Sequence, residues 1–131
     1  MKIERFEDIE GWQEARMLAQ MVYEVSSKGQ FARDFRLRRQ IEDAAASVMA
    51  NIAEGFDAGS DAEFIRFLGY ARRSASEVQS HLYIALDRDY VAEEDFDAIY
   101  QKAVQAKKLI NGFIRYLRQS QAQTTQPQKT T

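Results

Sequence analysis

The stretch N-I-A-E-G-F-D-A-G-S-D-A-E-F, from Asn51 to Phe64, contains the sharpest break between apolar repeats in this chain. Before it, apolar residues recur every three or four positions, which is the spacing of one helix face. The repeat stops at Gly55. Ser60, with Glu63 three positions later, then matches a capping box, in which two side chains satisfy free N–H groups at a helix start. We therefore expect one helix to end near residue 56 and the next to begin near residue 61.

The same spacing continues on both sides of this break and predicts long helices throughout the chain. Glycines are sparse and the single proline is Pro127, a distribution that favours helices over many short strands. Connections of about four to eight residues force successive helices to run antiparallel. The expected fold is all-α, an up-down-up-down antiparallel four-helix bundle over residues 1–120, followed by a disordered polar tail at 121–131. The predicted helices span about 7–28, 33–56, 61–88 and 93–119.

Composition limits the class of protein. The chain has 131 residues, 45% of them hydrophobic, with a formal net charge of -2, which suits one domain with a single core. The absence of cysteine excludes disulfides, thiolate metal sites and a cysteine nucleophile. The N-terminus is too acidic for a signal peptide, and no stretch is apolar for long enough to span a bilayer. We expect a cytoplasmic protein.

Several of the predicted helices carry a second set of apolar residues beyond the stripe that a bundle needs. Two explanations remain open: a wide core stripe, or the interface of a homo-oligomer, which small residues favour because they let helices approach closely. The oligomer interface candidates are Ala46, Met49 and Ala53. The remaining members of the second set are Ile65, Tyr83, Ile84, Tyr100, Val104 and Ile114.

Four arginines at the start of the second predicted helix face the positive end of its dipole, where cations are unfavourable. The bundle topology places these arginines at the same end as residues 87–97, which are strongly acidic. Ion pairs within or between subunits would offset the arginines; the alternatives are contact with RNA or phosphate, or simple solvation. The candidate nucleic-acid contacts are Arg33, Arg36, Arg38, Arg39, Arg72 and Arg73.

No motif for catalysis is present. The single histidine, His81, lacks a second histidine or a cysteine, and Glu77 four residues before it does not complete a carboxylate metal cage. Asn51 and Glu54 share a helix face but have no nucleophile beside them, so we expect them to hydrogen-bond backbone groups of the nearby corner or of another subunit. The helix-corner or interface residues are Asn51, Glu54, Gly55, Ser60 and Glu63. We expect no enzyme, metal or cofactor.

Four segments together resemble one family. They are F-E-D-I-E-G-W-Q-E-A-R at 6–16, Q-I-x-x-A-A-x-S-V-x-A-N-I-A-E-G at 40–55, S-D-x-E-F-I-R-F-L at 60–68 and L-D-R-D-Y-V at 86–91. Over about residues 5–118 the chain resembles the four-helix-bundle proteins of the bacterial 23S rRNA intervening-sequence family.

The resemblance implies a bundle that assembles as a ring-like homopentamer, with a non-enzymatic role as a scaffold or adaptor. It also implies kinship with the accessory variability protein of diversity-generating retroelements. The alternative function is therefore direct binding of RNA, in company with a ribonucleoprotein or a reverse transcriptase. The chain departs from the family pattern at Glu42 and Asp43, where basic residues are usual, at the acidic loop 57–59, and at Met49 in place of a proline.

Overall fold

Helices make up all the regular structure of residues 3–125, the part of the chain that the computed structural model describes. A short 3-10 turn precedes four long helices, and one short helix lies between the first two of these. The elements are η1 (Phe6–Asp8), α1 (Glu10–Ser26), α2 (Gly29–Arg33), α3 (Phe35–Phe56), α4 (Asp61–Asp87) and α5 (Glu93–Thr125).

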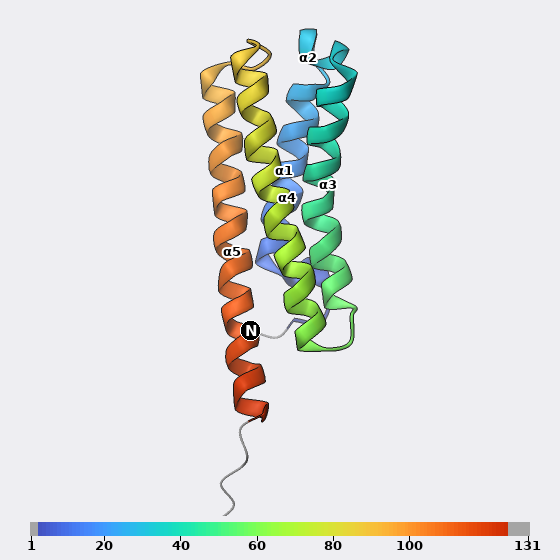
Figure 1. The fold of residues 1–131 in the computed structure, drawn as a ribbon, viewed down its shortest axis with the longest axis vertical. Coiled ribbons are helices and arrows are strands. Elements are labelled where there is room, and N and C mark those ends of the chain that lie inside the picture. The colour runs from blue at the N-terminus through green and yellow to red at the C-terminus, as the bar shows by residue number, and fades with distance from the viewer. Residues whose placement is uncertain (1–2, 126–131) are drawn as a thin grey trace, which may run out of the picture.

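The four long helices form the expected up-down-up-down bundle (Figure 1). Around the bundle, α3 packs between α1 and α4, and α5 packs between α4 and α1. Consequently α1 lies diagonally across from α4, and α3 lies diagonally across from α5. The starts of α3 and α5 are at the same end of the bundle but at opposite corners of it.

The core consists of the apolar stripes that the helical spacing predicts. In α3 and α4, the residues of the main stripe from Leu37 to Ile52 and from Leu68 to Ala85 are buried. Ile114 of α5 was assigned to the second apolar set, but only 4% of it is exposed, so it belongs to the core. Phe64 closes one end of the core by packing its ring at a tilt against that of Phe113, with 5.2 Å between ring centroids.

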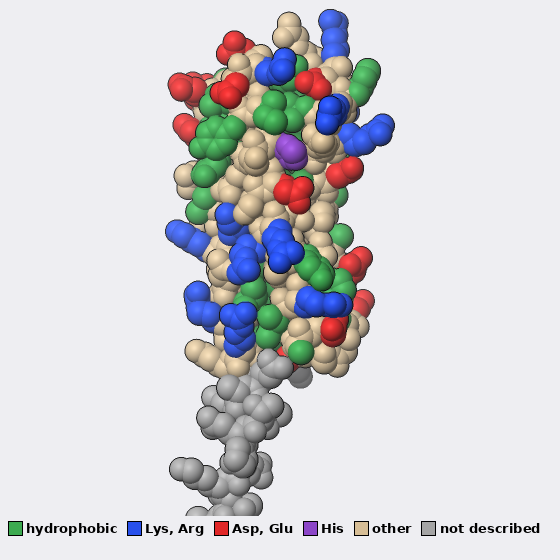
Figure 2. Space-filling view, viewed as in Figure 1, with side chains coloured by type: hydrophobic (Ala, Val, Ile, Leu, Met, Phe, Trp, Pro, Cys, Tyr) green, Lys and Arg blue, Asp and Glu red, His purple; other side chains and the backbone are tan. Residues whose placement is uncertain are grey.

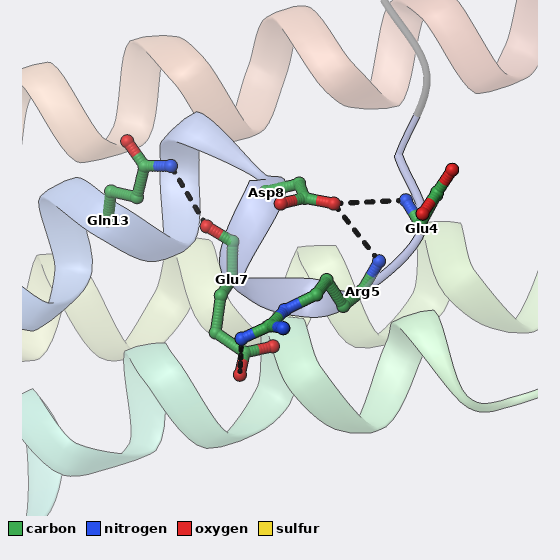
Figure 3. A network of polar contacts seen from close by, with 5 residues as sticks. All are labelled: Glu4, Arg5, Glu7, Asp8 and Gln13. Atoms are coloured by element: carbon green, nitrogen blue, oxygen red, sulfur yellow. Dashed lines mark hydrogen bonds and ion pairs between the residues drawn. The ribbon is translucent and has the colours of Figure 1, made fainter.

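The first predicted helix begins later than expected because a separate turn precedes it (Figure 3). The carboxylate of Asp8 accepts hydrogen bonds from the backbone N–H groups of Glu4 (3.1 Å) and Arg5 (3.2 Å), which caps the start of the turn. The side-chain amide of Gln13 donates to the carbonyl oxygen of Glu7 (2.9 Å) and so ties the turn to α1. The expectation of one continuous helix from residue 7 is therefore wrong; α1 begins at Glu10.

The second predicted helix is also divided. Phe31 in the short α2 is fully buried, and the chain then turns at Asp34 before α3 begins at Phe35. Asp34 is the N-cap of α3, because its Oδ1 accepts a hydrogen bond from the N–H of Leu37 (3.1 Å). The predicted start at Arg33 is thus corrected to Phe35.

The end of α4 is a Schellman motif, in which two N–H groups fold back onto the last turn of the helix. Tyr90 donates to the carbonyl of Ala85 (2.8 Å) and Asp89 donates to that of Leu86 (3.0 Å). Asp89 adopts φ +58°, the left-handed conformation that this motif requires. The connection that follows leads directly into α5.

The last helix is longer than the sequence predicts. α5 continues to Thr125, so residues 121–125, which we expected to be disordered, extend the helix. The rest of the expected tail, 126–131, lies outside the described residues. No helix within residues 3–125 combines the length and apolarity needed to cross a lipid bilayer.

Candidate functional site

Asn51 belongs to a polar network between α3 and α4. Its side-chain amide donates to the carbonyl oxygen and to the hydroxyl of Ser47 (both 2.9 Å), and the hydroxyl of Ser74 donates to that of Ser47 (3.0 Å). The expected bonds to the corner loop do not form, because side chains on a helix lean toward its N-terminus and Asn51 therefore points away from the corner. Glu54, three residues later, is exposed.

Close packing and a cap build the corner between α3 and α4. Gly55 is buried, and a Cβ atom there would lie 2.8 Å from Cδ1 of Phe64 and 2.9 Å from Cβ of Phe67. The hydroxyl of Ser60 accepts a hydrogen bond from the N–H of Glu63 (3.2 Å), which is one half of the predicted capping box. The carboxylate of Glu63 instead pairs with Arg66 (2.8 Å).

The arginines at the start of α3 are largely left without intramolecular partners. Arg38 pairs with Glu42 at 3.0 Å, but Arg33, Arg36 and Arg39 are exposed and make no hydrogen bond or ion pair within residues 3–125. Of the acidic residues that we expected to meet them, those at the start of α5 stand across the diagonal of the bundle, and Asp87 and Asp89 at the end of α4 make no ion pair within residues 3–125. The predicted ion pairs therefore do not form within the described residues.

One contact does link this corner to the α4–α5 connection. The hydroxyl of Tyr90 donates to Oδ2 of Asp34 (3.0 Å), and its ring stacks on Phe31 with 5.5 Å between centroids. The hydrogen bond from the backbone N–H of Leu37, followed by the one from Tyr90, lowers the pKa of Asp34 below its ordinary value. The same bond raises the pKa of Tyr90, because removing its proton would leave two anions together.

Arg72 and Arg73 lie in a second basic region, in the middle of α4. They border a groove of about 420 Å³ between α4 and α5, where Arg72 bonds the side chain of Asn111 (3.0 Å) and Lys107 bonds that of Gln79 (3.0 Å). The guanidinium groups of Arg66 and Arg73 lie over the ring of Tyr70, 5.9 and 5.8 Å from its centre. Figure 2 shows basic side chains gathered over the middle and the lower part of the described bundle.

The structure thus separates the six candidate nucleic-acid contacts into two groups. Arg72 lies about ten residues or more from the end of α4 that adjoins Arg36, and a helix rises about 1.5 Å per residue. The two groups are therefore more than about 15 Å apart along the bundle. A single short RNA contact does not include both groups.

The second apolar set divides between core and surface. Met49, Ile65 and Tyr100 are partly buried against the core, whereas Ala46 is exposed and Ala53 is half-buried. Tyr83 and Ile84 of α4 remain 50% and 43% exposed. The sequence reading missed Phe35, which is 73% exposed, although an aromatic residue outside the apolar stripe and flanked by arginines is visible in the sequence.

Tyr83 takes part in an aromatic cluster between α4 and the first turns of α5. Its ring centre lies 5.0 Å from that of Phe96 and 6.0 Å from that of Tyr100, and the latter two rings stack at 5.6 Å. Glu93 and Asp97 share this side of α5, because they precede Tyr100 by seven and three positions. The start of α5 therefore presents aromatic rings beside carboxylates.

Two observations concern the side chains that could bind a metal ion or transfer a proton. Within residues 3–125 no group of three or more His, Cys, Asp or Glu side chains is placed to hold a metal ion. Nδ1 of His81 is buried without a hydrogen-bond partner in the described part of the chain. Such a histidine has no group to orient it as a base.

Comparison with known proteins identifies the family. The profile of the 23S rRNA-intervening sequence proteins matches residues 7–112. The chain belongs to that family. A solved structure described as a protein of unknown function from the S23 ribosomal protein family of Bacteroides thetaiotaomicron VPI-5482 is similar, with a TM-score of 0.73 and 25% identity. The match covers 79% of this chain and 97% of that one. No curated protein matches the chain.

Proposed function

We propose that this protein is a non-enzymatic scaffold that acts as a homo-oligomer. The observation that carries the proposal is the number of large hydrophobic side chains left open on a bundle whose core is already filled. Where exposed large apolar side chains gather on a small protein, another chain commonly covers them. The exposed residues include Met17, Tyr23, Phe35, Tyr83, Ile84 and Tyr116.

Small residues support the same proposal. Ala46 is exposed on α3 and Ala53 is half-buried further along the same helix, and both leave room for a second helix to approach. Family membership and the resemblance in sequence favour a homopentameric ring acting in the cytoplasm. A scaffold of this type holds its partners at fixed spacing and needs no reactive groups of its own.

Size-exclusion chromatography with light scattering tests the proposal. We expect a single species at low salt with a mass several times the 15.1 kDa of the chain, five times for a pentamer, and the absorbance ratio of protein alone. A species that stays monomeric at all concentrations would refute self-assembly. Absorbance at 260 and 280 nm on the same peak reports bound nucleic acid.

The groove between α4 and α5 favours a second function, the binding of RNA. Arg72, Arg73 and Lys107 place three cations beside one groove, and Tyr70 adds an aromatic surface on which a base could stack. The partner would be an RNA, alone or in a ribonucleoprotein that includes a reverse transcriptase.

The test is binding of a fluorescent single-stranded RNA as a function of salt. Replacing Arg72 and Arg73 with Ala should weaken binding and flatten its salt dependence, because fewer counterions are released. Replacing Arg16 and Lys28, two exposed cations of the α1 region, is the matched control and should leave binding nearly unchanged. Equal losses in both variants would indicate a nonspecific effect of net charge.

A further inference from the structure

Two surfaces at one end of the bundle have complementary chemistry. The arginine-phenylalanine surface consists of Arg33, Phe35, Arg36 and Arg39. Phe35 is the most exposed large hydrophobic residue of residues 3–125, and the three arginines around it have no ion-pair partner there. An exposed aromatic ring beside unpaired cations is suited to an acidic aromatic surface.

The acidic aromatic surface has that composition. It consists of Tyr83, Glu93, Asp97 and Tyr100. Tyr83 is half exposed, and the buried Phe96 contacts both tyrosine rings from within the core. Glu93 and Asp97 are exposed and make no ion pair within the described residues. Carboxylates beside electron-rich rings attract arginine in two ways, through charge and through the ring face.

The two surfaces cannot meet within one chain. They stand at the same end of the bundle, but α3 and α5 lie at diagonal corners with α4 and α1 between them. Acidic side chains gather at the upper left of the view in Figure 2 and basic ones at the upper right, over the starts of α5 and α3. A second copy placed beside the first, without being turned over, brings one surface against the other at the same height.

We infer that the arginine-phenylalanine surface of one copy binds the acidic aromatic surface of the next copy. Phe35 packs against Tyr83 and Tyr100, and the arginines pair with Glu93 and Asp97. Every copy supplies one surface of each kind, so the contact is heterologous, and its repetition closes a ring when the rotation between copies divides a full turn. The inference rests on the proposed self-assembly and specifies its interface.

This interface also explains the charge at the start of α3. Cations at a helix N-terminus are unfavourable, and Asp34 alone does not balance three exposed arginines there. Carboxylates from the next copy would supply the missing anions. The acidic residues at the start of α5 suit the dipole of their own helix, but Glu93 and Asp97 make no ion pair within the described residues and are available to the next copy.

Reciprocal charge reversal tests the inference. The first variant, Arg36→Glu with Arg39→Glu, loses the basic surface, and the second, Glu93→Lys with Asp97→Lys, loses the acidic one. In light scattering at low salt, each variant alone should be monomeric at concentrations at which the wild-type chain is assembled. An equimolar mixture should assemble beyond the heterodimer with the two variants alternating, because the native surfaces of the two variants match each other and so do the reversed ones. The chain with all four reversals should regain the wild-type mass.

Two controls separate assembly from folding and from overall charge. Arg115→Glu with Arg118→Glu makes the same charge change near the other end of the bundle, on exposed positions, and should keep the wild-type mass. Phe35→Ala changes one exposed side chain, so it should keep the helical circular dichroism and the unfolding temperature of a dissociated chain while weakening assembly at least tenfold.

The outcomes distinguish the inference from the proposal on which it rests. If the wild-type chain assembles and the first two variants assemble to the same mass, this interface is overturned but self-assembly is not. A monomeric wild-type chain overturns both. The wild-type peak could also absorb at 260 nm because of bound nucleic acid. If the arginine variant loses that absorbance but keeps its subunit number, the arginine-phenylalanine surface binds nucleic acid and the inference is overturned.

Discussion

Gly55 offers a sharp test of how the α3–α4 corner is held, because replacing it with Ala adds a single methyl group. That Cβ would lie 2.8 Å from the ring of Phe64 and 2.9 Å from Cβ of Phe67. Neither neighbour can swing aside: the Phe64 ring is buried, and Cβ of Phe67 is fixed to the backbone of α4. The two helices must therefore separate, and overpacking of this kind costs about 1–3 kcal/mol.

The intrinsic preference of helices for Ala opposes this cost. In a helix interior, Gly→Ala gains about 0.5–1 kcal/mol, and less one residue before the helix end, where Gly55 lies. The net expectation is destabilisation by about 1–2 kcal/mol. For a chain of this length, that lowers the midpoint of thermal unfolding by roughly 4–8 °C.

Gly69→Ala in α4 is the matched control. A Cβ there meets nothing within 4 Å, so only the helix preference acts, and the free energy of unfolding should rise by about 0.5–1 kcal/mol. Thermal and urea unfolding at one fixed protein concentration measure both variants. If Gly55→Ala is as stabilising as Gly69→Ala, the close approach of the two helices is not what the corner depends on.

Three further changes test local features of the fold. Asp89→Gly should raise the free energy of unfolding by about 0.5–1 kcal/mol in urea titrations, because Asp89 holds φ +58° and glycine adopts that conformation without strain; a loss of stability would contradict this. Ser60→Ala should lower it by about 1 kcal/mol through loss of the N-cap, and an unchanged urea midpoint would show that the bond to Glu63 contributes nothing. Because the pKa of Asp34 is lowered in the folded chain, its stabilising effect is complete above its ordinary pKa of 3.8 and is lost as the pH falls through the lower folded value. Asp34→Asn, which can still cap α3, should therefore show a shallower loss of stability below about pH 4 than the wild-type chain; parallel curves would argue against the bonds from Leu37 and Tyr90.

The bundle itself can be predicted from the sequence because each helix repeats apolar residues at one spacing. Stripes such as Leu37 to Ile52 are buried as expected, and Ser60 marks the start of α4 correctly. The errors fall where local signals compete. The apolar Phe31 falls in a predicted connection, yet it is buried in α2, and α3 is capped by Asp34 instead of beginning at Arg33.

The surfaces are harder to predict than the core, because they depend on which helices are neighbours. Topology alone places the arginines of α3 and the acids of α5 at one end, and this suggested ion pairs between them. Only the packing order shows that a diagonal separates them. In the same way, helical spacing could not assign Ile114 to the core and Tyr83 to the surface, since both lie beside the main stripe.

The length of α5 has a consequence for whatever is attached to its C-terminal end. The helix continues past the corner between α3 and α4 and leaves the bundle at the end opposite the start of α3 (Figure 1). A fluorophore or a binding peptide joined there is kept away from Phe35 and its surroundings. In a ring of parallel subunits, several copies of such a peptide would project from one side, and their high effective concentration would turn weak individual binding into strong avidity.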